Sequence, residues 1–119
     1  MRAAVNRSND RTIADRVRVA DTFFSRLRGL LGMATLPDGD ALLIKPCNSV
    51  HTVGMRYPID VVFLDRDTRV LKVVQNLPPW RAAACAKSAM VLELPAGTVF
   101  RTGTEAGHSL TLLVGVKAP

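Results

Sequence analysis

Hydrophobic and polar residues follow one another in short alternating runs along most of the chain, which is the pattern of half-buried β-strands. In TIADRVRVA, residues 12–20, two arginines alternate with two valines, so one face of the segment would be wet and the other dry. The sequence DRDT, residues 65–68, would join two strands as a hairpin. Apolar runs bounded by turn residues predict further strands at residues 41–44, 50–55, 59–64, 69–74, 90–94 and 109–114.

One α-helix is predicted, over residues 22–31. Arg26 and Arg28 fall on one side of this helix and are most simply solvated; if they turn toward Asp60, they become part of a polar pocket with an affinity for anions. Asp21 or Thr22 can cap its first turn by accepting hydrogen bonds from free backbone N–H groups. The apolar residues recur at helical spacing on the other side and form a single stripe of Phe23, Phe24, Leu27, Leu30 and Leu31.

Several short strands with one helix predict a mainly β fold, which would be a small β-sandwich, jelly-roll-like or barrel-like domain. The chain has 119 residues, enough for one compact domain but not for two. We expect a single β-rich domain over residues 12–117, preceded by a flexible polar segment at residues 1–11. Residues 99–102 could add one helical turn. The connection at residues 76–88 is long and holds two prolines, which is typical of functional or mobile loops.

The composition narrows the class of protein. The longest apolar runs span about four residues, whereas a membrane helix needs about 20, and no secretory signal is visible, so a cytoplasmic location is expected. Cys47 and Cys85, the only cysteines, are expected to be free thiols. Neither CxxC nor zinc-like spacing occurs, so no metal and no cofactor is predicted.

The net charge of +6 favours anionic partners in general. The arginines are dispersed along the chain, however, and aromatic residues make up only 5%, which argues against a dedicated nucleic-acid binder. We therefore expect a small-molecule ligand, anionic ligands included, or a protein partner.

The densest group of chemically active residues lies in PCNSVHTVGMRYPIDVVFLD, residues 46–65. Cys47, Asn48 and His51 have the composition of a thiol hydrolase, with a nucleophile, an orienting amide and a base. A strand would hold the thiol and the imidazole about 13 Å apart, whereas a turn at residues 48–49 would bring them closer. The alternative is that Cys47 is a small buried side chain and His51 bonds a neighbouring carbonyl.

Two carboxylates stand inside apolar runs. Asp60 precedes VVFL and is either a structural clamp that bonds backbone N–H groups at a bend or a carboxylate that lines a pocket. Arg56 could pair with it across the bend at Pro58. Glu93 stands between two leucines, so by default it would face solvent. It could instead join Asp60 as a second acid for proton transfer or cation binding.

Three stretches together resemble a known family: RLRGLLG at 26–32, the stretch at 46–65 and VLELPAGT at 91–98. In this order and spacing they are similar to the bacterial and archaeal domain of unknown function 192 (DUF192) family, over about residues 12–115. The resemblance implies a small, mainly β fold of sandwich or jelly-roll type with a short helix, and it brings no established activity. It also implies a family pattern that runs through Gly29, Leu30, Met55, Pro58, Asp60, Phe63, Glu93 and Gly97.

The leading hypothesis is a ligand- or partner-binding module with a polar cleft near residues 47–60, bordered by the loop at 78–88. Met55 could instead belong to the core, and Arg81 with Trp80 could form a lip over a ligand or cover the core. The second hypothesis is a hydrolase-like enzyme that uses Cys47 or His51 with a carboxylate. The candidate ligand-binding residues are Cys47, His51, Met55, Arg56, Asp60, Arg81 and Glu93.

Overall fold

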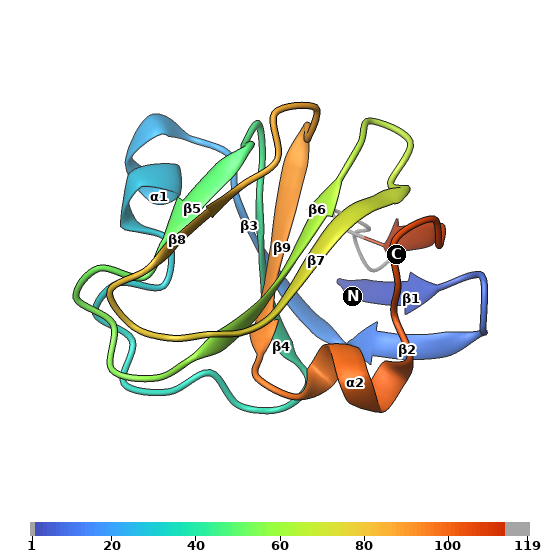
Figure 1. Ribbon diagram of the computed structural model, residues 1–119, viewed down its shortest axis with the longest axis horizontal. Coiled ribbons are helices and arrows are strands. Elements are labelled where there is room, and N and C mark those ends of the chain that lie inside the picture. Colours follow the sequence, from blue (N-terminus) through green and yellow to red (C-terminus); the bar gives the residue numbers. More distant parts are fainter. Residues whose placement is uncertain (1, 114–119) are drawn as a thin grey trace, which may run out of the picture.

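The computed structural model describes residues 2–113 and confirms a mainly β fold. Five strands form the central sheet in the order β3–β4–β9–β6–β7 (Figure 1). Neighbouring strands are antiparallel except β3 and β4, which run parallel because the chain crosses over between them through helix α1 (Phe23–Arg28). The bounds of the five strands are β3 Arg16–Ala20, β4 Asp40–Ile44, β6 Ile59–Leu64, β7 Val70–Leu77 and β9 Met90–Pro95.

A three-stranded sheet and a short helix cover one face of the central sheet. The strands β1 (Ala3–Asn6), β2 (Arg11–Ala14) and β10 (Leu110–Leu113) pair in the order β10–β1–β2, and the helix is α2 (Thr98–Thr102). In Figure 1 this layer lies to the right of the central sheet. The core between the layers contains Ala4, Ile13, Ala14, Val17, Ala41, Leu43, Val62, Leu64, Val70, Leu92, Leu94, Val99 and Leu110.

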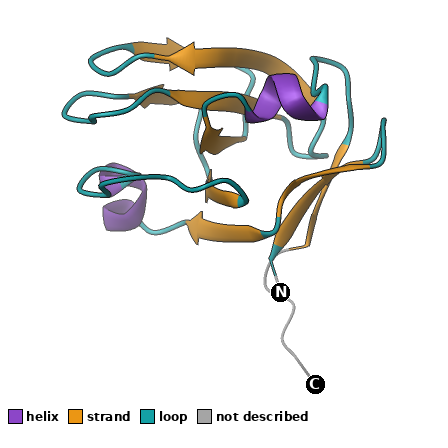
Figure 2. Ribbon diagram, turned by 90° about the horizontal axis from the view of Figure 1, so that it is seen from below, coloured by secondary structure: helices purple, strands orange, loops and turns teal. Residues whose placement is uncertain are grey.

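The opposite face is covered by α1 and by a two-stranded ribbon of β5 (Ser49–His51) and β8 (Ala82–Ala84). Figures 1 and 2 both place α1 at the end of the molecule away from the N-terminus and from the β1–β2 sheet. This second core contains Ala20, Leu30, Leu42, Ile44, Val50, Met55, Ile59, Val61, Phe63, Leu77 and Val91.

Strand β6 explains why two cores exist. All six of its residues are buried, as expected for a central strand that is covered on both faces. Val62 belongs to the core under β1, β2 and β10, whereas Val61 and Phe63 belong to the core under α1, β5 and β8. The predicted hairpin at residues 65–68 is confirmed, because β6 pairs antiparallel with β7.

The N-terminal segment differs from the prediction. Residues 1–11 were expected to be flexible, but Ala3–Asn6 form strand β1, which pairs with β10 about a hundred residues later. Asn6 is fully buried, and its side-chain amide contacts His108 at 3.0 Å. Nothing in the local sequence indicates this strand, since its partner lies at the other end of the chain.

Helix α1 also differs from the prediction, in length and in orientation. Thr22 caps it by accepting a hydrogen bond from the Ser25 N–H, and the helix ends at Gly29 after six residues. An apolar stripe on a surface helix ordinarily faces the core. Here Phe23 and Phe24 are 66% and 79% exposed, and no residue of the helix is buried.

Two loops differ in detail from the strands expected there. The strand predicted at 50–55 is confined to β5, because the chain turns after His51 and Met55 donates its N–H back to the Thr52 carbonyl. The long connection at 76–88 contains β8, whose alanines pair with β5. Together these segments cover the same face of the central sheet as α1.

Candidate functional site

Glu93 is the residue around which the candidate site is built. It lies in the middle of β9, opposite Leu42 of β4 and Val61 of β6. Because side chains alternate along a strand, Glu93 points to the face covered by α1 and β5, while its neighbours Leu92 and Leu94 point to the other core. The default expectation that Glu93 faces solvent is therefore wrong, and its side chain is buried at 3% exposure.

Glu93 lines a cavity of about 70 Å³ between α1, β5 and the central sheet. We call it the Glu93 cavity. Gly29 forms part of its roof at the end of α1 with a φ of +51°, a conformation that favours glycine. A Cβ built on Gly29 would lie 3.8 Å from Glu93 Oε1, so the helix end sits directly over the carboxyl group. The lining consists of Arg26, Leu27, Arg28, Gly29, Leu30, Leu31, Ile44, Cys47, Ser49, Val50, His51, Val53, Met55 and Glu93.

The Glu93 carboxyl group is both buried and incompletely bonded. Its Oε1 atom has no hydrogen-bond partner among the described residues. Burial raises the pKa of Glu93 from 4.5 to about 7, because the charged form loses the hydration that it would have in water. A carboxyl group that titrates near neutral pH can accept a hydrogen bond when ionised and donate one when protonated.

Two further polar atoms near Glu93 lack partners. The buried Nε of Arg26 has none, although another nitrogen of the same guanidinium donates to the Pro46 carbonyl at 3.1 Å. The Tyr57 hydroxyl is also buried without a partner, and burial followed by the Glu93 charge raises the pKa of Tyr57. Arg26 and Glu93 line the same cavity but form no ion pair within residues 2–113.

Cys47 lines the Glu93 cavity but is not activated as a nucleophile. Its Sγ donates to the Ser49 carbonyl at 3.1 Å, and burial raises the pKa of the Cys47 thiol. A reactive cysteine needs the opposite shift, because the thiolate is the nucleophile. His51 also lines the cavity, but its Nδ1 accepts a hydrogen bond from Val53 N–H at 3.3 Å.

Met55 is both core and lining. It is 8% exposed, packs in the second core and contributes to the wall of the Glu93 cavity. The structure therefore brings four of the seven candidate residues around one cavity: Cys47, His51, Met55 and Glu93.

Asp60 serves a separate task on the opposite face of the sheet. Its carboxylate accepts hydrogen bonds from the backbone N–H groups of Asn76, Gly97 and Val99 at 2.8 to 3.1 Å. These bonds connect β7 and the start of α2 to β6. Asp60 is therefore a structural clamp and not a carboxylate that lines a pocket. The proposed pairing of Asp60 with Glu93 as a second acid is wrong, because the two side chains leave the sheet on different sides.

The remaining two candidates also lie outside the Glu93 cavity. Arg56 is exposed and makes no ion pair with Asp60 in the described part of the chain. Arg81 is exposed as well, and its backbone N–H donates to Thr52 Oγ1 at 2.9 Å. Both arginines lie on segments beside the ribbon rather than in the cavity wall.

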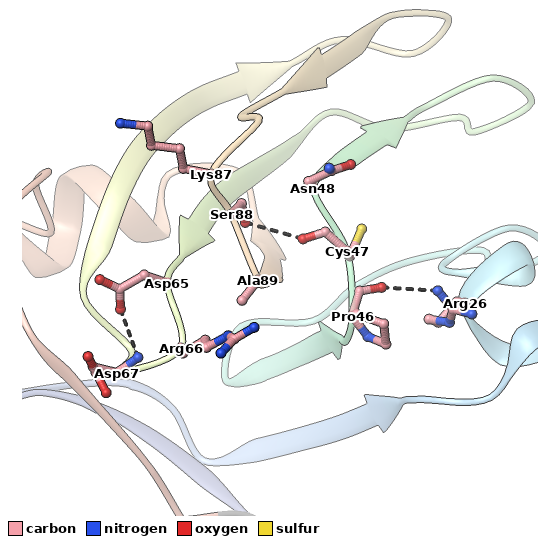
Figure 3. Close-up of a pocket in the computed structure, with 10 residues that line it drawn as sticks. All are labelled: Arg26, Pro46, Cys47, Asn48, Asp65, Arg66, Asp67, Lys87, Ser88 and Ala89. Carbon is pink, nitrogen blue, oxygen red and sulfur yellow. Dashed lines mark hydrogen bonds between the residues drawn. The ribbon is translucent and has the colours of Figure 1, made fainter.

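A wider and more open hollow of about 700 Å³ lies on the other side of Cys47 (Figure 3). Arg26 lines this hollow as well, and the other charged side chains in its wall are exposed or hold turns. Asp65 Oδ1, for example, accepts from the N–H groups of Asp67 and Arg69, both at 2.9 Å. The Ser88 hydroxyl likewise bonds the Cys47 carbonyl at 3.2 Å. The smaller Glu93 cavity is the better candidate, because it alone of these two has a buried, unbonded carboxyl oxygen in its wall.

Residues 4–112 match the model of the DUF192 family, which is described as an uncharacterized ACR. The chain belongs to the DUF192 family. UPF0127 proteins of two archaea are similar to it. The protein of Thermococcus sibiricus is 33% identical over 89% of this chain and 71% of its own length. The protein of Pyrococcus horikoshii is 35% identical over 78% of this chain and 84% of its own length.

Two solved structures share the DUF192 fold seen here. A protein of unknown function from Novosphingobium aromaticivorans superposes with a TM-score of 0.79 at 21% identity, over 92% of this chain and 82% of that one. A protein of Sinorhizobium meliloti, described as a candidate transcription regulator, superposes with a TM-score of 0.80 at 24% identity, over 93% and 91%. At these identities the likeness shows the fold.

Six of the eight residues in the pattern that the resemblance implied fall into two groups in this structure. Gly29, Leu30, Met55 and Glu93 surround the cavity, whereas Asp60 and Gly97 form the clamp at α2. Sequence reasoning took Arg26 most simply as a solvated residue, with a polar pocket beside Asp60 as the alternative, and did not place it in the wall of a cavity with Glu93. The signal in the sequence was its position within RLRGLLG, three residues before the glycine that covers Glu93.

Proposed function

We propose that this DUF192 protein is a small-molecule-binding module and that the Glu93 cavity holds the polar end of its ligand. The observation that supports the proposal is Glu93 Oε1, a buried carboxyl oxygen without a partner. Leaving such an atom unbonded costs about 1–3 kcal/mol, and a ligand that donates a hydrogen bond would recover this cost. The mostly apolar wall with a few convergent polar groups is typical of ligand sites.

The chemistry of the wall suggests the kind of group that fits. Glu93 offers an acceptor, and the unpartnered Nε of Arg26 offers a donor. A neutral group that both donates and accepts, such as a primary amide or a hydroxyl, matches the two together. The volume of about 70 Å³ admits only a small group. The rest of a larger ligand would lie over Leu27, Leu31 and Val53, which line the cavity and are exposed.

The hydrolase alternative has no comparable support. Thiol catalysis needs a lowered pKa at the cysteine and a base within hydrogen-bonding distance. Burial instead raises the pKa of Cys47, and the thiol donates to a backbone carbonyl. The His51 ring bonds a backbone N–H rather than the thiol.

The proposal can be tested with acetamide as a probe in ¹H–¹⁵N NMR titrations of the full chain. We expect saturable shifts of backbone amides that line the Glu93 cavity, Gly29 and Ser49 among them. At a pH above the pKa of Glu93, acetone, which accepts but cannot donate, should bind at least about tenfold more weakly, because it leaves the ionised carboxylate without a donor.

The variant Glu93→Met keeps the length of the side chain and removes its acceptor, and it should weaken acetamide binding at least about tenfold. Glu105→Met is the matched control, since Glu105 is 72% exposed and does not line the cavity. An absence of shifts at the cavity, or equal binding by wild type and Glu93→Met, would contradict the proposal.

A further inference from the structure

The exposed apolar side chains are concentrated at one end of the molecule. Among the described residues, eight large hydrophobic side chains are exposed, and six of them lie on α1 or on the loops beside the β5–β8 ribbon. We call these six the α1 patch: Phe23, Phe24, Leu27, Leu31, Val53 and Trp80. A cluster of this kind is unusual on a monomer surface and indicates that something binds there.

Three observations place side chains of the patch beside one another. The rings of Phe23 and Phe24 meet edge to face with centroids 5.4 Å apart. Leu27, Leu31 and Val53 line the same cavity mouth. The backbone N–H of Trp80 donates to the backbone carbonyl of Thr52 at 3.0 Å, which holds the backbone of Trp80 beside the residue that precedes Val53. Figure 1 shows α1, β5 and β8 together at this end.

The charge around the α1 patch has one sign. Residues 22–36, 45–59 and 76–84, which carry the patch, contain no Asp or Glu. Two acidic residues adjoin these segments: Asp21, which is exposed at the start of α1, and Asp60, which is buried in β6. The same segments carry five basic residues: Arg26, Arg28, Lys45, Arg56 and Arg81. None of these five takes part in an ion pair within the part of the chain that the structure describes.

We propose that the α1 patch docks on a membrane surface that contains anionic lipids. Arg26 and Arg28 flank Leu27 on the same short helix as the two phenylalanines. A partner must therefore have an apolar layer for the phenylalanines immediately below negatively charged groups for the arginines. An anionic bilayer has this arrangement everywhere along its surface, and interfacial segments rich in arginine, phenylalanine and tryptophan bind there. The protein would lie on the membrane and not cross it, since no helix of the described chain is long and apolar enough to span one.

A second copy of the chain fits this face less well. Two copies that met through the α1 patch would bring five basic residues of each chain together, and the exposed Asp21 is a single carboxylate against them. An RNA would match the charge and could stack on Phe23, Phe24 and Trp80, but it would leave the aliphatic side chains of the patch without the apolar partner that a bilayer supplies. An acidic protein remains the competing occupant, and the experiment below separates it from the membrane.

The test is co-sedimentation of the full chain with vesicles of phosphatidylcholine alone or of phosphatidylcholine mixed with phosphatidylglycerol. We expect binding to the mixed vesicles and little to the neutral ones. Trp80 is the only tryptophan, so its fluorescence should shift to the blue when the patch enters the interface.

Phe23→Ser with Phe24→Ser should weaken vesicle binding at least about tenfold, because the two rings lose their burial in the membrane. Arg28→Gln should weaken it roughly fivefold. Phe100→Ser is the matched control, since Phe100 is 83% exposed but lies on α2, outside the patch, and should bind like wild type. Circular dichroism verifies that each variant is folded. We expect all of them to fold, because the substituted side chains are exposed.

Three results would overturn the membrane proposal. They are no binding to the mixed vesicles, equal binding to neutral vesicles, and unchanged binding by the double phenylalanine variant. Retention on immobilised polyglutamate without vesicle binding would assign the face to an acidic protein partner instead. None of these results depends on acetamide binding in the Glu93 cavity, so the two proposals can fail separately.

Discussion

At the scale of single residues, the two buried carboxylates show two different ways of keeping an acid inside a protein. Asp60 has its oxygens bonded by three backbone N–H groups, which satisfy the charge and fix the start of α2. Glu93 has an unbonded oxygen, and burial raises its pKa to about 7. The first arrangement serves the fold, and the second leaves an acceptor free for a ligand.

The stability of the protein should depend on pH through Glu93. Its pKa in the folded state, about 7, lies above the ordinary value of 4.5, so the folded state holds the proton more tightly than the unfolded chain. The contribution of Glu93 to stability is therefore complete below pH 4.5 and is lost as the pH rises toward 7. The loss amounts to roughly 3 kcal/mol above that range.

The variant Glu93→Gln cannot titrate, so urea unfolding of both proteins at acid and mildly alkaline pH isolates this effect. We expect the variant to gain stability relative to wild type as the pH rises, by up to roughly 3 kcal/mol. Every other titrating group is common to both proteins. Parallel pH profiles would show that Glu93 is hydrated or bonded in the folded protein, against the account given above.

Sequence reasoning anticipated the residue types of the site better than their positions. Both Cys47 and Glu93 were candidates and line one cavity, but Glu93 was expected in solvent. The alternation rule correctly put Glu93 opposite its two leucines; it could not show that α1 and β5 cover that face as well. The burial of Arg26 Nε depends on how α1 is docked, which the local pattern does not determine.

At the scale of elements, α1 is the helix that departs most from its sequence pattern. The apolar stripe was recognised from its spacing, but only Leu30, which follows the helix, is buried, at 3% exposure. The spacing of a stripe indicates a helix and not the surface on which the stripe lies. The strands of the central sheet were easier to predict, because each carries its own apolar run and turn boundaries.

Two alanine variants distinguish the buried and exposed parts of this stripe. Leu30→Ala should cost about 3 kcal/mol of unfolding free energy, because it leaves a cavity in the second core. Phe24→Ala should change the free energy by less than about 0.5 kcal/mol, because the ring is 79% exposed. Chemical denaturation of both variants measures the difference. A large loss from Phe24→Ala would mean that the ring packs against the protein in solution.

At the scale of the whole molecule, three layers create two cores, and the two cores separate the clamp from the cavity. Strands β6 and β9 are covered on both faces, so a side chain on either must be apolar, bonded or available to a ligand. The mainly β class and the DUF192 resemblance were both evident from the sequence. Strand β1 and its pairing with β2 and β10 were not, because that pairing joins the two ends of the chain, although strands at 12–20 and 109–114 were predicted.

The layers also decide the character of the Glu93 site. The sheet, α1 and the β5–β8 ribbon together exclude water from position 93, and the raised pKa follows from that exclusion. If the layers were loosely packed on this side, water would hydrogen-bond the carboxyl group, and a ligand would gain nothing by bonding it.

The most direct test is therefore a ¹³C NMR titration of the Glu93 side-chain carboxyl group in the full chain. The protein contains two glutamates, so selective labelling gives two signals, and the exposed Glu105 serves as the reference. The account predicts a midpoint of about 7 for Glu93. A midpoint near the ordinary value of 4.5 would contradict it, since the carboxyl group would then be in contact with water.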